Sequence, residues 1–219
     1  LQSVLPSDKP VVLTCAMRPS TAVNPDGPQN LRDALSVAMD PDAKGVLVVC
    51  AGLVHTAEHV QKIHPYRLDA FSSGDAGPVG SVENSRVSWS VLPLPCTPPA
   101  WAASDWSTDR PWPQVEIVLN HTGATGAVVQ ALVQAGVQGL VAAGTGNGTL
   151  SQPLTEALQL AMASGVQVVR STRCAFGHVI GENNALIPVA QGLSPVKARV
   201  ALQLSLLGLA AANATKPVD

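Results

Sequence analysis

The sequence is poor in aromatic and in charged residues. Aromatic side chains make up 3% of its 219 residues and charged side chains 13%, and the formal net charge at pH 7 is -2. Without a basic excess the chain lacks the electrostatic footprint of a nucleic-acid-binding protein, so we expect no nucleic-acid partner. Because so few rings are available, we expect a core built mainly from Val, Leu and Ala, which favours layered α/β architecture.

Long apolar runs are also missing. No run approaches the roughly 20 residues that are needed to span a bilayer, so we expect no membrane partner. The N-terminus shows no basic segment followed by an apolar one, which is the pattern of a secretory signal. The compartment, cytoplasmic or periplasmic, stays open because the first residue is Leu1 and not methionine.

The patterns of metal and nucleotide sites are absent or incomplete. The four cysteines form no C-x-x-C pair, and Cys15 and Cys50 lie in apolar runs, where a thiol packs like a small hydrophobic side chain. His55 and His59 have helical i, i+4 spacing, but no third ligand accompanies them, so we interpret them as surface histidines. The glycine-rich segment 144–148 has neither the lysine of a P-loop nor the spacing of a dinucleotide fingerprint. We expect unpaired thiols, no metal and no organic cofactor.

The sequence does contain an alternation of apolar runs and helical patterns. The apolar run 11–16 ends in Met-Arg-Pro, a Gly-Pro pair then opens a helix, and a second apolar run, 46–50, follows a turn. Strand, helix and strand within about forty residues form a βαβ unit, which predicts parallel strands. The helix is expected to bury four side chains at helical spacing: Leu31, Ala34, Leu35 and Ala38.

The middle of the chain predicts an edge of the sheet and then a domain boundary. Residues 53–64 have helix-forming stretches, and the alternating segments 75–82 and 86–90 indicate a hairpin. Residues 92–113 contain six prolines and three tryptophans. Because proline cannot donate to a ladder, we interpret this stretch as a connector between domains 1–91 and 114–219.

The second half restarts the alternating pattern. Strands are predicted at 115–119, 139–143 and 166–170, and helices at 127–134 and 154–163. A last helix is predicted to begin with Ser194 as N-cap and Pro195 in its first turn. It is expected to bury Val196, Val200, Leu204 and Leu207. This half therefore predicts a smaller α/β domain.

The sequence of segment 9–31, KPVVLTCAMRPSTAVNPDGPQNL, resembles that of the bacterial-type L-asparaginase (asparaginase/glutaminase) family. Members carry a Lys-Pro-Val-Val strand, an Ala-Met-Arg-Pro turn and an Asp-Gly-Pro-x-Asn-Leu helix start in this order, and the resemblance extends from 9 to about 207. It implies an α/β fold with a larger parallel-sheet domain, here incomplete at its N-terminus, and a smaller C-terminal α/β domain. We therefore expect the chain to be the C-terminal two-thirds of a longer protein, truncated at its N-terminus.

The resemblance also implies roles for single residues. By spacing alone Lys62 is a solvated surface charge, whereas the resemblance makes it the essential lysine that helps a threonine nucleophile. The main chain of Ala16 and the side chain of Asn147 match substrate-binding positions, with Asn147 reaching the site of a neighbouring subunit. Glu182, the only acid in its interval, is the candidate for an acidic residue that contacts substrate across the dimer interface. Neither Thr-Gly-Gly-Thr nor Gly-Thr-Asp-Thr occurs in the chain.

The activity implied for the complete protein is hydrolysis of L-asparagine or L-glutamine to the acid and ammonia without a cofactor, in a homo-oligomer built as a dimer of dimers. Because the threonine motifs are missing, we expect the chain as written to be inactive and the nucleophile to lie upstream. Two other interpretations stay open. One is a catalytically inactive binding chain or pseudoenzyme, and the other is the asparaginase-like subunit of a glutamyl-tRNA amidotransferase.

Overall fold

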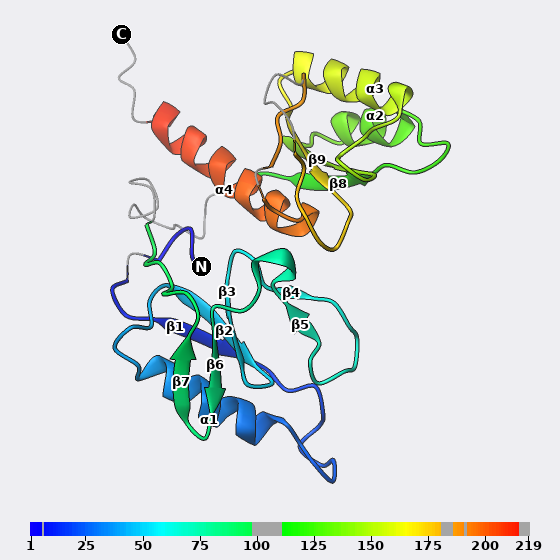
Figure 1. The fold of residues 1–219 in the computed structure, drawn as a ribbon. Coiled ribbons are helices and arrows are strands. Elements are labelled where there is room, and N and C mark those ends of the chain that lie inside the picture. Colours follow the sequence, from blue (N-terminus) through cyan, green and yellow to red (C-terminus); the bar gives the residue numbers. More distant parts are fainter. Residues whose placement is uncertain (6, 98–110, 181–185, 191, 215–219) are drawn as a thin grey trace. The chain divides into compact units, whose positions relative to one another are not determined.

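A computed structural model describes residues 1–5, 7–97, 111–180, 186–190 and 192–214 (Figure 1). It divides into two compact units, residues 1–105 and 106–219, and each is considered by itself. Of the predicted connector 92–113, residues 98–110 lie outside the described residues. No helix among the described residues has both the length and the apolar character needed to cross a membrane.

The first unit is built on a five-stranded sheet with the order β1-β2-β3-β6-β7. Its strands are β1 (Val11–Thr14), β2 (Val46–Cys50), β3 (Leu53–Thr56), β6 (Gly80–Glu83) and β7 (Arg86–Trp89). The predicted parallel pairing of β1 with β2 is confirmed, and the remaining pairs of this sheet are antiparallel. The predicted hairpin is also confirmed, since β6 and β7 lie at the edge of the sheet.

Helix α1 (Gly27–Ala38) covers one face of this sheet and closes a core that includes Ala34, Val37 and Leu47 (Figure 1). The expected buried set was largely wrong. Leu31 and Leu35 are 54% and 53% exposed, and Ala38 is exposed as well. The stripe that faces the sheet is Asn30, Asp33, Ala34 and Val37. The helix is rotated from the expected face because Asn30 is drawn toward the strand ends.

The helical prediction for 53–64 was wrong. The segment forms β3, a turn and the short strand β4 (Gln61–Lys62), which pairs with β5 (Phe71–Ser72) ahead of a 3-10 turn, η1 (Gly74–Ala76). A two-residue connection, Ala51-Gly52, causes this difference. Both residues have positive φ, 52° and 75°, so the chain folds straight back from β2 into an antiparallel strand.

The second unit has a three-stranded parallel sheet with the order β10-β9-β8. Its strands are β8 (Val115–Leu119), β9 (Gly139–Gly144) and β10 (Gln167–Thr172), and its helices are α2 (Ala127–Gln134), α3 (Gln152–Ala163) and α4 (Pro195–Ala214). Helices α2 and α3 cover one face and α4 the other (Figure 1). Because both faces are covered, every residue of the central strand β9 is buried. The predicted α/β fold class is confirmed in both units.

Helix α4 was predicted only in part. Leu204 and Leu207 are buried as expected, whereas Val196 and Val200 are exposed. The side chain that α4 buries at its start is Ala198, packed with Val115 and Val141 of the sheet. This face is selected because Arg199, the next residue, donates a hydrogen bond to the carbonyl oxygen of Val115 at 2.7 Å.

Candidate active site at the carboxyl ends of β1 and β2

A loop held by one carboxylate follows β1. Asp26, just before α1, accepts hydrogen bonds from the backbone N–H groups of Met17 at 2.9 Å and Arg18 at 2.8 Å. Burial raises the pKa of the Asp26 carboxyl, but these hydrogen bonds outweigh it and hold the pKa below its usual value. Asp26 is therefore ionised at neutral pH and fixes the two residues that follow Ala16. Ala16 is an exposed residue, and its backbone groups make no hydrogen bond to another described residue.

A single buried amide joins the ends of the two parallel strands. The side chain of Asn30, 3% exposed, donates to the carbonyl oxygen of Cys15 at 2.9 Å and to Asp26 at 3.1 Å. Its oxygen accepts a hydrogen bond from the N–H of Ala51 at 3.1 Å. The sequence reasoning gave Asn30 no role. No pattern in the sequence identified it, because the expected buried face of the helix did not include Asn30.

Asn30 also stabilises an unusual backbone. Ala51 adopts the left-handed conformation at φ 52°, which costs about 1 kcal/mol for a residue with a side chain. The hydrogen bond from its N–H to Asn30 holds this conformation. The strained turn thus lies directly at the end of β2, beside the loop of Ala16.

Two thiols lie across the strand ends. Each of the four cysteines is a free thiol, and the sulfur atoms of Cys15 and Cys50 are 3.9 Å apart. Cys15 is exposed and Cys50 is buried. Burial, together with the neighbouring Cys15, raises the pKa of the Cys50 thiol to about 12. Cys50 therefore remains protonated at neutral pH.

The hairpin that carries Lys62 reaches the same end of the sheet. Lys62 is exposed on β4, and its Nζ lies 5.8 Å from the centroid of the Phe71 ring. The loop between β4 and β5 contacts the site through the carbonyl oxygen of Leu68, which lies 3.9 Å from the sulfur of Cys50. The charges of Lys62 and Asp26 both act on the Cys50 thiol. The structure thus brings Lys62 and the Ala16 loop together around Cys50.

A buried histidine fastens this hairpin to the sheet. His55, on β3 and 2% exposed, is hydrogen-bonded through Nδ1 to the hydroxyl of Ser73 at 2.8 Å. Its Nε2 has no partner among the described residues, and burial lowers the pKa of the imidazole. His59 lies in the turn after β3, where it bonds to Thr56. The interpretation of His55 as a surface histidine was wrong, because β3 turns its side chain into the interior.

The candidate residues of the second unit lie in a separate loop. The side chain of Asn147 donates to the carbonyl oxygen of Ile180 at 2.5 Å and accepts from its N–H at 2.6 Å. The amides of Thr145 and Thr149 bond to each other's carbonyl oxygens, so this glycine-rich turn is closed on itself. Glu182 lies outside the described residues. No group of three or more metal-binding side chains occurs in the described parts of the chain.

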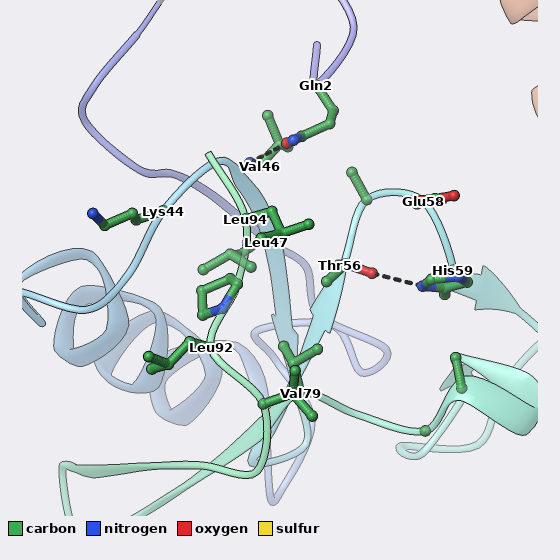
Figure 2. A pocket seen from close by; sticks show the side chains of 15 residues that line it. Gln2, Lys44, Val46, Leu47, Thr56, Glu58, His59, Val79, Leu92 and Leu94 are labelled. Atoms are coloured by element: carbon green, nitrogen blue, oxygen red, sulfur yellow. Dashed lines mark hydrogen bonds between the residues drawn. The ribbon is translucent and has the colours of Figure 1, made fainter. Parts of the chain in front are cut away.

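A cavity of about 260 Å³ lies at the other end of β2 (Figure 2). Its apolar lining includes Val46, Leu47, Val79, Leu92 and Leu94. Gln2 borders it and accepts a hydrogen bond from the N–H of Val46 at 2.6 Å. Since Val46 begins β2 and Cys50 ends it, this cavity is distinct from the candidate site.

Comparisons with known proteins cover both units. The family described as "Asparaginase, N-terminal" matches residues 1–93, and the "Glutaminase/Asparaginase C-terminal domain" matches residues 114–213. L-asparaginase 2 of Escherichia coli is 37% identical over 91% of this chain and 59% of its own length. L-asparaginase 2 of Bacillus subtilis is 36% identical over 94% of this chain and 56% of its own length. The glutaminase-asparaginase of Pseudomonas fluorescens is also 36% identical, over 94% of this chain and 59% of its own length.

The fold agrees with these matches. The crystal structure of a probable cytoplasmic L-asparaginase from Campylobacter jejuni superposes with a TM-score of 0.86 at 34% identity, covering 94% of this chain and 67% of that one. The chain spans 56 to 59% of the length of the three curated relatives named above. Since matched segments run from the Ala-Met-Arg-Pro loop through the Gly-Asn-Gly turn, the chain belongs to the asparaginase/glutaminase family.

Proposed function

We propose that the protein to which this chain belongs hydrolyses the side-chain amide of L-asparagine or L-glutamine and releases ammonia. The observation that carries the proposal is Ala16, an exposed residue without a backbone hydrogen-bond partner among the described residues, in the loop that Asp26 holds at the end of β1. The loop of the Lys62 hairpin contacts the neighbouring Cys50. Relatives named L-asparaginase and glutaminase-asparaginase are 36 to 37% identical to this chain. Their names point to the amide as the bond that is cut.

Lys62 is the residue of this chain to which we assign proton transfer. Its ammonium lies on an exposed hairpin and forms no ion pair with another described residue. Such a group is able to take up and return the proton of a hydroxyl nucleophile. The sequence contains no Thr-Gly-Gly-Thr. We therefore propose that the attacking threonine, its partner threonine and an aspartate lie in parts of the protein outside these 219 residues.

We assign substrate binding to the main chain of Ala16 and to Asn147 and Glu182. Asn147 bonds to both backbone groups of Ile180, which fixes the orientation of its side chain. In the proposed assembly, a homo-oligomer built as a dimer of dimers, Asn147 and Glu182 complete the site of a neighbouring copy.

The test is ammonia release from L-asparagine and L-glutamine by the full-length protein. Lys62→Met is expected to lower kcat by about 10³-fold, because removing a general acid-base typically costs 10² to 10⁴. Lys44→Met is the matched control, since Lys44 is an exposed lysine at the other end of β2, and it is expected to keep full activity. Undiminished turnover by Lys62→Met would overturn the assignment.

The second candidate function is a catalytically inactive binding chain. The absence of both threonine motifs from the sequence is the observation that favours it. A soluble, folded full-length protein that releases no ammonia from either amide, but binds L-asparagine in calorimetry, would establish this alternative.

A further inference from the structure

The thiols of Cys15 and Cys50 are placed as a disulfide requires. Cys15 and Cys50 directly follow the paired residues Thr14 and Val49, so Cys15, just beyond the end of β1, lies next to Cys50, the last residue of β2. Strands about 4.8 Å apart fall within the Cα separation of about 4.4 to 6.8 Å at which disulfides form. The sulfur atoms are 3.9 Å apart and a disulfide needs about 2 Å, so rotation of the side chains supplies most of the approach.

The surroundings give the two thiols different roles. Cys15 is exposed and reaches solvent, while Cys50 is buried between Asn30 and the carbonyl oxygen of Leu68, at 3.8 and 3.9 Å. A small oxidant from solvent therefore meets Cys15 first, and Cys50 is held in place to react with the product. An exposed thiol beside a second, less accessible thiol is the geometric part of the arrangement of a peroxide-sensitive cysteine and its resolving cysteine.

We propose that Cys15 and Cys50 form a reversible disulfide when the protein meets a hydroperoxide such as hydrogen peroxide. The sulfur of Cys15 attacks one peroxide oxygen, the O–O bond breaks, and Cys15 becomes a sulfenic acid while one water leaves. The sulfur of Cys50 then attacks the Cys15 sulfur, and its proton goes to the departing hydroxide to form a second water. Two thiols and one hydrogen peroxide thus give one disulfide and two waters.

The other two cysteines offer no comparable pair. Cys96 bonds to the side chain of Gln2, and Cys174 lies near the carbonyl oxygen of Gly146 in the second unit. Neither has a second cysteine as its neighbour among the described residues. The reaction is therefore expected to be selective within this chain.

The disulfide would act on the candidate site through Ala16, which directly follows Cys15. The part of the approach that side-chain rotation does not supply comes from the backbone of Cys15, and it shifts the adjoining main chain of Ala16 that we assign to substrate binding. This consequence rests on the proposed function. The expected result is a rise in the KM for the amide substrate that a thiol reductant reverses.

The test uses the full-length protein with Cys96→Ser and Cys174→Ser, so that Cys15 and Cys50 are the thiols left in this region. After hydrogen peroxide, we expect the loss of both thiols, a mass lower by two hydrogen atoms, and a disulfide-linked peptide pair after proteolysis. Dithiothreitol should restore both thiols. With Cys50→Ser added, Cys15 should stop at the sulfenic acid and be trapped by dimedone.

Results of three kinds would overturn the proposal. They are retention of both thiols, addition of oxygen without a disulfide, and a disulfide that joins two chains through Cys15. None of these measurements uses an amide substrate. A protein that forms the disulfide but releases no ammonia when reduced therefore refutes only the proposed function, and an active protein that forms no disulfide refutes only this proposal.

Discussion

Replacing Asn30 with alanine tests whether one buried amide holds the candidate site together. The side chain makes hydrogen bonds to the carbonyl of Cys15, the carboxylate of Asp26 and the N–H of Ala51, at 2.9 to 3.1 Å. Each such bond contributes about 1 kcal/mol net, so Asn30→Ala is expected to lower the free energy of unfolding by about 3 kcal/mol. No further cost of a buried polar group without a hydrogen-bond partner is expected. Cys15 and Ala51 are exposed, so water can replace the lost side chain as their partner.

The measurement is urea unfolding of the full-length protein. Val23→Ala is the control, because Val23 is 96% exposed in the loop before α1, and its change is expected to stay within about 0.5 kcal/mol. Asn30→Ala should also raise the KM for the amide substrate, since the loop of Ala16 loses its anchor. Equal urea midpoints for the two variants, with equal slopes, would show that the amide does not hold the strand ends.

Two further predictions concern the same end of the sheet. Ala51→Gly removes the left-handed strain at φ 52° and should stabilise the protein by about 1 kcal/mol in urea unfolding, a gain that should be absent if Ala51 is unstrained. Burial lowers the pKa of His55 below the usual histidine value of 6.5, so the unfolded chain binds its proton first as pH falls. Stability should therefore decline from pH 6.5 downward, until the pH reaches the folded pKa. His55→Gln should flatten this slope, whereas the exposed control His59→Gln should keep it, and an unchanged slope in His55→Gln would contradict the argument.

The strands and the fold class could be predicted from the sequence, because buried parallel strands leave uninterrupted apolar runs. The segments 46–50 and 115–119 coincide with β2 and β8. The face of α1 could not be predicted in this way. Apolar spacing placed Leu31 and Leu35 inward, whereas the structure buries Asn30 and Asp33. A polar residue that is satisfied by distant backbone groups gives no periodic signal.

The turn after β2 was missed for a related reason. Two-residue hairpin connections usually carry Asn, Asp or Gly at positive φ, and this one has such a residue only at its second position, Gly52, because Ala51 occupies the first. Without this turn, segment 53–64 was interpreted as helical and His55 as exposed. The family resemblance supplied Lys62 and Ala16 as candidates, but not what holds them. That depends on the register of β1 against β2, which places Cys15 beside Cys50 and which the βαβ pattern does not specify.

The same contacts couple the thiols to the lysine hairpin. In the reduced state the sulfur of Cys50 lies 3.9 Å from both the Cys15 sulfur and the carbonyl oxygen of Leu68. A bond to Cys15 removes the S–H donor and draws the sulfur toward β1, so the contact with Leu68 is lost. Leu68 belongs to the loop between β4, which carries Lys62, and β5. The hydrogen bond between His55 and Ser73 is a second contact that holds this hairpin to the sheet. The position of the ammonium should therefore depend most strongly on His55 when the thiols are oxidised.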